Sequence, residues 1–354
     1  MPEREFDYAI IGAGALGSLL AAHLVTNGVD VLLVDESDRR RAQIESAGVR
    51  VVGYKDVPTC HPAIVPMSGL AQRTRKRVGT AVLAVPPRNV APTLERLREA
   101  VRPDTPLLSL VGGLGHIEDV SAWAGETVLG VVNLEACLDP SGNVEAAFHN
   151  FLWLGNLAST LTPEMRRMQR DLAWVGPTLT TKAILGMLWG KALYALESSL
   201  PAFVNVRPAE FFADEANRNV AVAVVREGIR IADALGVTPV AFDFFDPNLY
   251  RASNAGEFAT LHVWIDHAWR RHEQFRFGAA YDFPTTCGLS WAMSPENPRT
   301  ELGALLDDFQ HRAREAGVDA PSLDALSDMA RRVSGGEKVA PSNLQAAIGE
   351  VATS

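Results

Sequence analysis

The sequence contains few cysteines, and their placement excludes two classes of protein. Cys60, Cys137 and Cys287 are the three cysteines in 354 residues; they are far apart and form no C-x-x-C pair. An odd number at such spacing fits neither a disulfide framework nor a zinc site built from cysteine pairs. We therefore expect a protein of the reducing cytoplasm.

Two further absences limit the partners. No apolar run is long enough to cross a bilayer, and the chain enters an apolar segment, FDYAIIGAG, almost at once, without a cationic leader and cleavage site. The chain has 42 Asp and Glu against 33 Lys and Arg, a formal net charge of −9. Because phosphate binding usually needs a concentrated basic face, we do not expect nucleic acid as a partner. Because no apolar run is long enough to cross a bilayer, we do not expect a membrane either.

The chain is long enough for two domains of ordinary size. In residues 1–177, short apolar runs alternate with helical stretches. Strands are expected at 6–13, 29–35, 80–85, 106–111 and 127–132, with helices at 15–28 and 89–101 between them. This alternation predicts an α/β fold of the Rossmann type, with a doubly wound parallel sheet covered on both faces.

Long helical stretches follow the turn-like WVGP at 174–177. Residues 178–354 are therefore expected to form an all-helical domain for substrate binding and dimerisation. Helices are expected at 181–200, 216–236 and 299–317. The apolar face of 216–236 favours a homodimer, although the same stripe could form part of a core.

The stretch IIGAGALG holds Gly12, Gly14 and Gly17 in a G-x-G-x-x-G pattern between a strand and a helix. Gly12 would permit the tight turn, Gly14 would let backbone N–H groups approach a pyrophosphate, and Gly17 would let the helix pack on the strand. Ala15 and Leu16 open the helix, whose N-terminus attracts an anion. The sequence predicts a dinucleotide site; the alternative is a similar sheet that binds nothing.

Asp35 ends the second strand about 20 residues later, where a carboxylate can accept hydrogen bonds from ribose hydroxyls. Asp35 would repel a 2′-phosphate, so NAD is expected in preference to NADP. Arg39, Arg40 and Arg41 follow closely and weaken this preference, unless they only begin a solvated helix.

The order of these features, with GAGALG at the start and LWGKALYALESSL opening the helical half, resembles the ketopantoate reductase family. Trp189 and Lys191 match one motif of that family, and Thr300, Glu301 and Leu302 match another. The resemblance implies that Lys191 donates a proton to the keto oxygen while a nicotinamide delivers hydride, and that Glu301 holds the substrate. It also places Val85 and Gly112 at the cofactor.

The chemistry of these two residues is reasonable in itself. Hydride arriving at a carbonyl carbon leaves charge on oxygen, which a positioned ammonium stabilises and neutralises. The alternative for Lys191 is a surface lysine that lays its stem on an apolar helix. The alternative for Glu301 is a first-turn acid that stabilises a helix N-terminus.

Departures from the family pattern change the expected substrate. The two asparagines expected after the lysine fall on Ala195 and Ser199, the later aspartate becomes Gly303, and the lysine of the cofactor side falls at or near Pro86. A pocket without these groups should bind a different small 2-oxo acid, or a related ketone or imine. Replacement contacts could come from a set of four: Tyr194, Ser198, Ser199 and Asn297.

Two other functions stay open. One is genuine 2-dehydropantoate 2-reduction with substituted contacts, and the other is a catalytically silent dinucleotide-binding protein. Region 242–298 is longer than the family pattern. Within it, segment 264–283 is expected to form a lid or a dimer contact, because the spacing of His267 and His272 does not favour a metal site.

Overall fold

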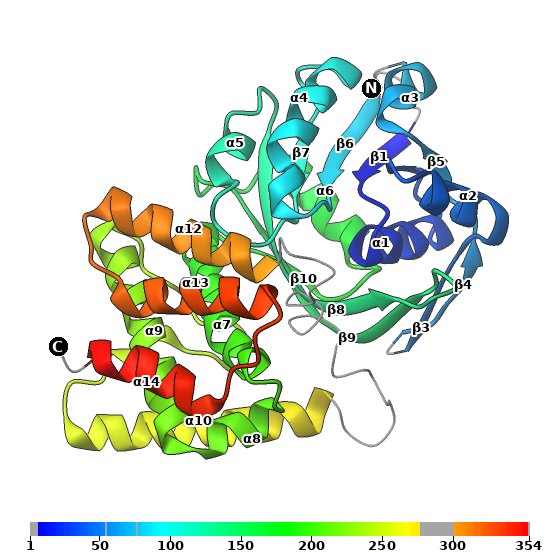
Figure 1. The fold of residues 1–354 in the computed structure, drawn as a ribbon. Coiled ribbons are helices and arrows are strands. Elements are labelled where there is room, and N and C mark those ends of the chain that lie inside the picture. Colours follow the sequence, from blue (N-terminus) through cyan, green and yellow to red (C-terminus); the bar gives the residue numbers. More distant parts are fainter. Residues whose placement is uncertain (1–5, 54, 76, 277–300, 353–354) are drawn as a thin grey trace. The chain divides into compact units, whose positions relative to one another are not determined.

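The computed structural model describes residues 6–53, 55–75, 77–276 and 301–352 (Figure 1). The chain divides into two compact units. Unit 1 comprises Met1–Gly112 and His116–Ile184, and unit 2 comprises Gly113–Gly115 and Leu185–Ser354.

Unit 1 is built on one sheet, which confirms the α/β prediction. Along the sheet the strand order is β4-β3-β9-β8-β7-β6-β1-β2-β5, and β10 pairs with β9. The strands are β1 (Phe6–Ile11), β2 (Val31–Val34), β3 (Val49–Gly53), β4 (Val57–Cys60), β5 (Ala63–Val65), β6 (Val78–Leu83), β7 (Leu107–Ser109), β8 (Thr127–Leu138), β9 (Val144–Gly155) and β10 (Thr178–Thr180).

The helices of unit 1 cover both faces of this sheet. Helix α1 (Ala15–Thr26) connects β1 to β2, and α4 (Val90–Ala100) connects β6 to β7 on the other side of β1. Along the strand order, the step from β1 to β2 and the step from β6 to β7 go in opposite directions. Because parallel crossovers are right-handed, α1 and α4 lie on opposite faces of the sheet. Helix α6 (Pro163–Leu172) packs beside α1 over the main core, and the remaining helices are α2 (Asp38–Ala47), α3 (Met67–Thr74) and α5 (Ile117–Ser121).

The sheet is mixed, because two of its strand pairs are antiparallel. Strand β9 runs antiparallel to β8, and β4 runs antiparallel to β3. A short turn joins β8 to β9, in which the backbone N–H of Asn143 donates to Oδ1 of Asp139 over 2.8 Å. Gly142 occupies this turn with φ of +83°. So short a connection can join only antiparallel neighbours.

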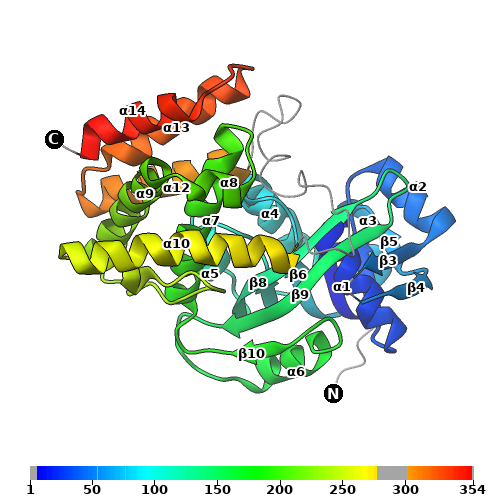
Figure 2. The same cartoon turned by 90° about the horizontal axis from the view of Figure 1, so that it is seen from below.

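Unit 2 is helical, as expected. Its elements are α7 (Ile184–Phe203), α8 (Pro208–Ala213), α9 (Glu215–Ala234), the 3-10 helix η2 (Pro247–Arg251), α10 (Ala255–Arg276), α12 (Glu301–Ala316), α13 (Pro321–Ser334) and α14 (Pro341–Ala352). Helices α8, α10, α12, α13 and α14 all pack against α9 (Figure 2). The apolar stripe of α9, which includes Val220, Val224 and Ile231, is therefore core, and it is not available for pairing.

Within the described ranges, no helix combines the length and the apolar character needed to cross a membrane.

Candidate functional site

The glycine-rich loop follows β1 at the point where the sheet changes direction, between β2 and β6. Open α/β sheets bind ligands at such a point, beyond the carboxyl ends of the strands. Gly12 has φ of +104°, and a Cβ there would lie 2.5 Å from the carbonyl oxygen of Ala84. A Cβ at Gly17 would lie 1.9 Å from the carbonyl oxygen of Gly12. Both positions need glycine for the fold itself.

Gly14 is a glycine for a different reason. It is exposed, it forms the N-cap of α1, and a Cβ there would have no atom within 4 Å. The fold therefore does not require glycine here, whereas a ligand that approaches the backbone of the first turn would. Ala15 and Leu16, both half-buried, follow in that turn. Val85 lies beside the loop, with Cγ1 3.2 Å from the Cβ position of Gly12.

Asp35 directly contacts the glycine-rich loop. Its Oδ2 accepts a hydrogen bond of 2.7 Å from the backbone N–H of Ala13, and its Oδ1 accepts one of 2.9 Å from the N–H of Ser37. Each carboxylate oxygen has a second lone pair. The half-buried carboxylate can therefore orient the loop and still accept a further donor such as a ribose hydroxyl.

The three arginines after Asp35 have different surroundings. Arg40 is only 8% exposed, and its guanidinium donates to the carbonyl oxygen of Ala13 at 2.8 Å, to Oγ of Ser18 at 2.8 Å and to the carbonyl oxygen of Gly142 at 2.9 Å. Burial lowers the pKa of Arg40.

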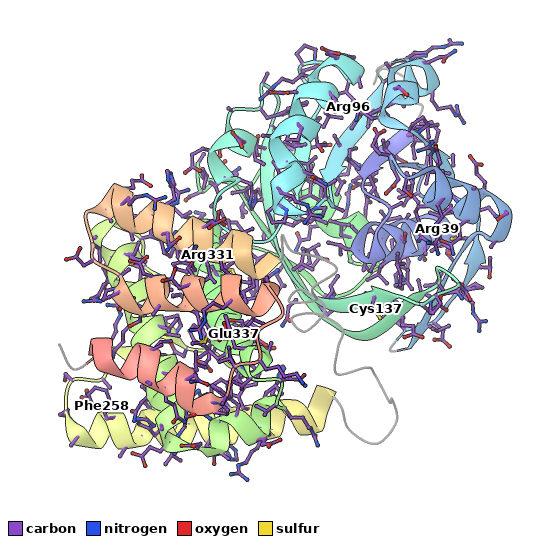
Figure 3. The ribbon with its side chains drawn as sticks, viewed as in Figure 1. Arg39, Arg96, Cys137, Phe258, Arg331 and Glu337 are labelled. Atoms are coloured by element: carbon purple, nitrogen blue, oxygen red, sulfur yellow. The ribbon has the colours of Figure 1, made fainter. Side chains whose placement is uncertain are left out.

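Arg41 donates to the carbonyl oxygen of Asp35 at 2.7 Å, and Arg39 is exposed (Figure 3). Arg40 and Arg41 therefore already have hydrogen-bond partners within unit 1, which disfavours their contact with the 2′-phosphate of NADP.

Gly112 lies in the loop after β7, which is the second strand from β1 on the side of β6. It is half-buried, and a Cβ there would have no atom within 4 Å. Pro86, where the resemblance places a lysine, is half-buried and precedes the 3-10 helix η1 (Pro87–Asn89). Unit 1 thus gathers the predicted cofactor residues at the carboxyl ends of β1, β2, β6 and β7.

The next three residues, Gly113–Gly115, belong to unit 2 and contact α12. Oδ2 of Asp308 accepts the backbone N–H of Leu114 at 2.7 Å, and Arg312 donates to the carbonyl oxygen of Leu114 at 3.2 Å. Burial raises the pKa of Asp308. No local pattern in the sequence indicates this contact, because 194 residues separate Leu114 from Asp308.

Lys191 lies on α7, the helix that opens unit 2. It is half-buried, whereas its neighbours Trp189 and Ala192 are buried. Gly186 and Gly190 lie one turn apart on the same helix, and a Cβ at Gly190 would be 1.8 Å from the carbonyl oxygen of Val240. The backbone N–H of Val240 also donates to the carbonyl oxygen of Gly186 at 2.9 Å. These glycines let an extended segment fix the part of α7 that carries Lys191.

One face of α7 stays partly accessible within unit 2. Lys191, Ala195, Ser198 and Ala202 follow the i, i+4, i+7, i+11 spacing of a single helical stripe, and all four are half-buried. The Ser198 hydroxyl donates to the carbonyl oxygen of Ala195 at 3.2 Å. The lysine is therefore followed on its own face by small side chains.

The proposed replacement contacts have mostly structural surroundings. Ser199 is buried, and its hydroxyl donates to the carbonyl oxygen of Leu196 at 2.7 Å. Tyr194 is buried in an aromatic cluster and stacks on Trp269 with ring centroids 6.0 Å apart. Asn297, Thr300 and Cys287 lie outside the described residues, as does the end of region 242–298. Glu301 is the first residue of α12.

Glu197, also on α7, is a buried acid that was not predicted from the sequence. It is 1% exposed, and its two carboxyl oxygens accept separate donors. The indole N–H of Trp269 donates to Oε1 at 2.6 Å, and the Tyr250 hydroxyl donates to Oε2. Burial raises the pKa of Glu197 to about 8, against the opposing effect of the Trp269 hydrogen bond. An acid within the apolar run ALYALESSL was the available signal.

The two histidines of α10 do not share a site. His267 is exposed, and the His272 ring contacts the rings of Phe244 and Trp269. Among the described residues, no three histidine, cysteine or acidic side chains form a group that could hold a metal ion.

Sequence comparison connects unit 1 to a known family. Residues 8–159 match the family model described as ketopantoate reductase PanE/ApbA. A 2-dehydropantoate 2-reductase of Pyrococcus horikoshii is 25% identical over 230 residues, which are 64% of this chain and 74% of that protein. A 2-dehydropantoate 2-reductase of Nostoc sp. is 22% identical and covers 91% of this chain and 93% of its own length.

Solved structures share the fold over most of the chain. A ternary structure of D-mandelate dehydrogenase with NADH and anilino(oxo)acetate has a TM-score of 0.73 at 19% identity, and it covers 93% of this chain and 98% of the other. A PanE/ApbA family ketopantoate reductase from Ralstonia eutropha has a TM-score of 0.72 at 18% identity, with the same coverage.

Proposed function

We propose that the chain is a divergent member of the ketopantoate reductase family, which residues 8–159 match, and that it is a nicotinamide-dependent reductase of a small 2-oxo acid with an apolar substituent. The observation that carries the substrate class is the accessible face of α7. There Lys191 is followed by Ala195, where the family pattern has an asparagine, and by Ser198, whose hydroxyl is bonded to its own helix.

The residues of unit 1 fit a dinucleotide. An open position at Gly14 leaves room for a pyrophosphate at the N-terminus of α1, and the Asp35 carboxylate can accept the ribose hydroxyls. Gly12, Ala15, Leu16, Gly17, Val85 and Gly112 complete the proposed cofactor site. When bound, the nicotinamide supplies a hydride. We infer NAD as the preferred cofactor, because a 2′-phosphate would meet the negative charge of Asp35.

In the proposed mechanism Lys191 is the proton donor. As the carbonyl carbon gains a hydride, the C=O π bond breaks and its electron pair moves to oxygen. The Lys191 ammonium stabilises that charge and transfers one proton to it, which gives the 2-hydroxy acid and a neutral amine. Solvent then returns a proton to the amine. We assign Glu301 the role of holding the substrate, since it begins α12 in the motif that matches the family.

A substrate panel tests this proposal. Purified protein would be assayed with NADH and with NADPH against ketopantoate and against phenylglyoxylate, the 2-oxo form of mandelate. We expect a higher kcat/KM with phenylglyoxylate and NADH, because Ala195 offers no amide to a hydroxylated substrate. A clear preference for ketopantoate would instead favour genuine 2-dehydropantoate reduction, the activity for which the curated relatives are named. Cofactor binding without any turnover would favour a silent dinucleotide-binding protein.

We also propose a homodimer, formed through the outer face of α10. Val263 and Trp264, at the middle of that helix, are 70% and 42% exposed. Antiparallel contact with a second copy about these residues would bring Glu257 of each chain toward Arg270 of the other. Light scattering after gel filtration tests this: we expect a dimer for the natural chain and a monomer for Trp264→Glu, whereas a monomeric natural chain would contradict it.

A further inference from the structure

Glu197 connects three elements of unit 2. It lies on α7, and its carboxyl group accepts the indole N–H of Trp269 from α10 and the hydroxyl of Tyr250 from η2. A carboxyl group that is 1% exposed is costly to bury unless its oxygens are hydrogen-bonded, and both of these are. Tyr250 and Trp269 lie 53 and 72 residues beyond Glu197, so the contact ties η2 and α10 to α7 across a long stretch of sequence.

One of the two partners of Glu197 also contacts Tyr194, which lies next to the face of α7 that carries Lys191. Successive residues of a helix are rotated by about 100°, so Tyr194 lies between Lys191 and Glu197 around the helix, about 60° from each. Tyr194 stacks on Trp269, with ring planes 7° apart, and it also contacts the ring of Phe245. Phe245 in turn packs on Tyr250, with ring centroids 5.2 Å apart. The Glu197 hydrogen bonds and this stack therefore hold the same stretch of α7.

We propose that Glu197 is a positioning residue: through its hydrogen bonds to Tyr250 and Trp269 it fixes η2 and α10 to α7 and thereby sets the orientation of the helix face that presents Lys191. This role rests on the proposed reductase function. Glu197 itself does not touch the reacting groups in the proposal. Its effect on catalysis passes through the aromatic side chains beside Lys191.

The surroundings of Glu197 favour the neutral form. Two charged or titratable side chains contact the partners of Glu197: the ring of His272 on α10 contacts Trp269, and Nε of Arg226 on α9 donates to the backbone carbonyl of Tyr250 at 2.8 Å. Arg226 thus bonds to main-chain oxygen and not to the carboxyl group. Burial raises the pKa of Glu197 to about 8, so the acid stays mostly protonated near neutral pH.

Glutamine is the matched replacement for a neutral acid. Its amide oxygen can accept the Trp269 N–H, and its NH2 group can donate to the Tyr250 oxygen once the Tyr250 hydroxyl turns its own proton away, so one hydrogen bond to each partner is kept and the side chain does not titrate. Glu197→Ala removes both contacts. Tyr250→Phe removes one of them and leaves the carboxyl group in place.

The first measurement uses no substrate. Near-ultraviolet circular dichroism of the natural chain and of Glu197→Gln would be followed from about pH 6 to about pH 10. We expect the spectrum of the natural chain to change with a midpoint near pH 8. We expect Glu197→Gln to keep, over the whole pH range, the spectrum that the natural chain has at low pH. A natural spectrum that does not change near pH 8, or an equal change in Glu197→Gln, would overturn the proposal.

The second measurement is kinetic. We expect Glu197→Gln to keep kcat within about twofold, and Glu197→Ala and Tyr250→Phe to lower kcat by about tenfold with little change in the KM for NADH, because the cofactor residues lie in unit 1. Equal kcat for all four proteins would overturn the positioning role. If none turns over any 2-oxo acid, the proposed function fails, and the spectroscopic titration still decides whether Glu197 fixes η2 and α10.

Discussion

The backbone N–H of Ala13 donates a hydrogen bond of 2.7 Å to Oδ2 of Asp35. This contact joins the two parts of the dinucleotide motif, the glycine-rich loop and the acid after β2. The carbonyl oxygen of Ala13 is held as well, by Ser18 at 2.9 Å and by Arg40 at 2.8 Å. A loop fixed at both polar groups of one residue is preorganised for an anion, since little further ordering is needed on binding.

Asp35→Ser should change the cofactor preference. We expect NADH affinity to fall by roughly tenfold and the preference for NADH over NADPH to shrink, because a charged hydrogen-bond acceptor for the ribose is lost. Fluorescence titration of each cofactor measures this, with the exposed Asp38→Ser as the matched control. Tighter binding of NADPH than NADH by the natural chain would contradict the assignment.

Gly14→Ala and Gly17→Ala should have opposite consequences. Alanine at position 14 meets no atom within 4 Å, so we expect nearly the natural Tm and a clear loss of cofactor affinity. Alanine at position 17 would put Cβ 1.9 Å from the carbonyl oxygen of Gly12, so we expect a large loss of stability. Thermal unfolding and cofactor titration separate the two effects. Unchanged affinity in Gly14→Ala would place the pyrophosphate elsewhere.

Arg40→Met should destabilise unit 1, whereas Arg39→Met should not. The buried Arg40 guanidinium bonds to the carbonyl oxygens of Ala13 and Gly142, and its removal leaves buried acceptors with fewer donors. We expect a loss of roughly 2 kcal/mol or more in the free energy of unfolding. Urea denaturation of both variants measures it. Equal stability of the two variants would show that the Arg40 contacts contribute little.

Lys191→Ala should abolish most of the turnover and leave the cofactor bound. General acid catalysis typically contributes about 10²- to 10⁴-fold, and we expect kcat to fall by that amount. NADH affinity, determined by residues of unit 1, should stay unchanged. Lys338→Ala removes an exposed lysine of the same unit and is the control. Full activity of Lys191→Ala would contradict the proton-donor role and favour the interpretation of Lys191 as a surface lysine.

The stability of the chain should decrease with pH in a window set by Glu197. Its pKa is about 8 in the folded chain against 4.5 for a freely solvated glutamate, so between these values the unfolded chain holds fewer protons than the folded one. The free energy of unfolding therefore falls as pH rises through the window, by up to ~1.4 kcal/mol per pH unit from this group. Urea denaturation of the natural chain and Glu197→Gln at several pH values measures the difference in slope. Parallel slopes would contradict a raised pKa.

The first half of the fold could be predicted well from local pattern. Strands β1 and β2 and helix α1 follow directly from short apolar runs around a glycine-rich turn. Strands β3, β4 and β5 were not predicted, because they are short and only partly buried, and their pairing with other strands determines them. The antiparallel β9 also depends on its partner β8, which sequence periodicity does not identify.

The site could be predicted less completely than the fold. The loop glycines and Asp35 follow a motif with a physical mechanism, and the structure brings them together. Glu197 needed its partners Tyr250 and Trp269, which lie 53 and 72 residues away, to become recognisable. The stripe on 216–236 was ambiguous because a core face and an interface have the same periodicity.

Isotope transfer tests the central claim most directly. NADH labelled with deuterium at the transferred position would be incubated with the purified protein and the 2-oxo acid that it reduces fastest, and the product would be examined by mass spectrometry. We predict one deuterium on the carbon of the former carbonyl group, with none at that carbon when unlabelled NADH is used in heavy water. Product without the label at that carbon, or no 2-oxo acid reduced by a chain that binds NADH, would contradict the account.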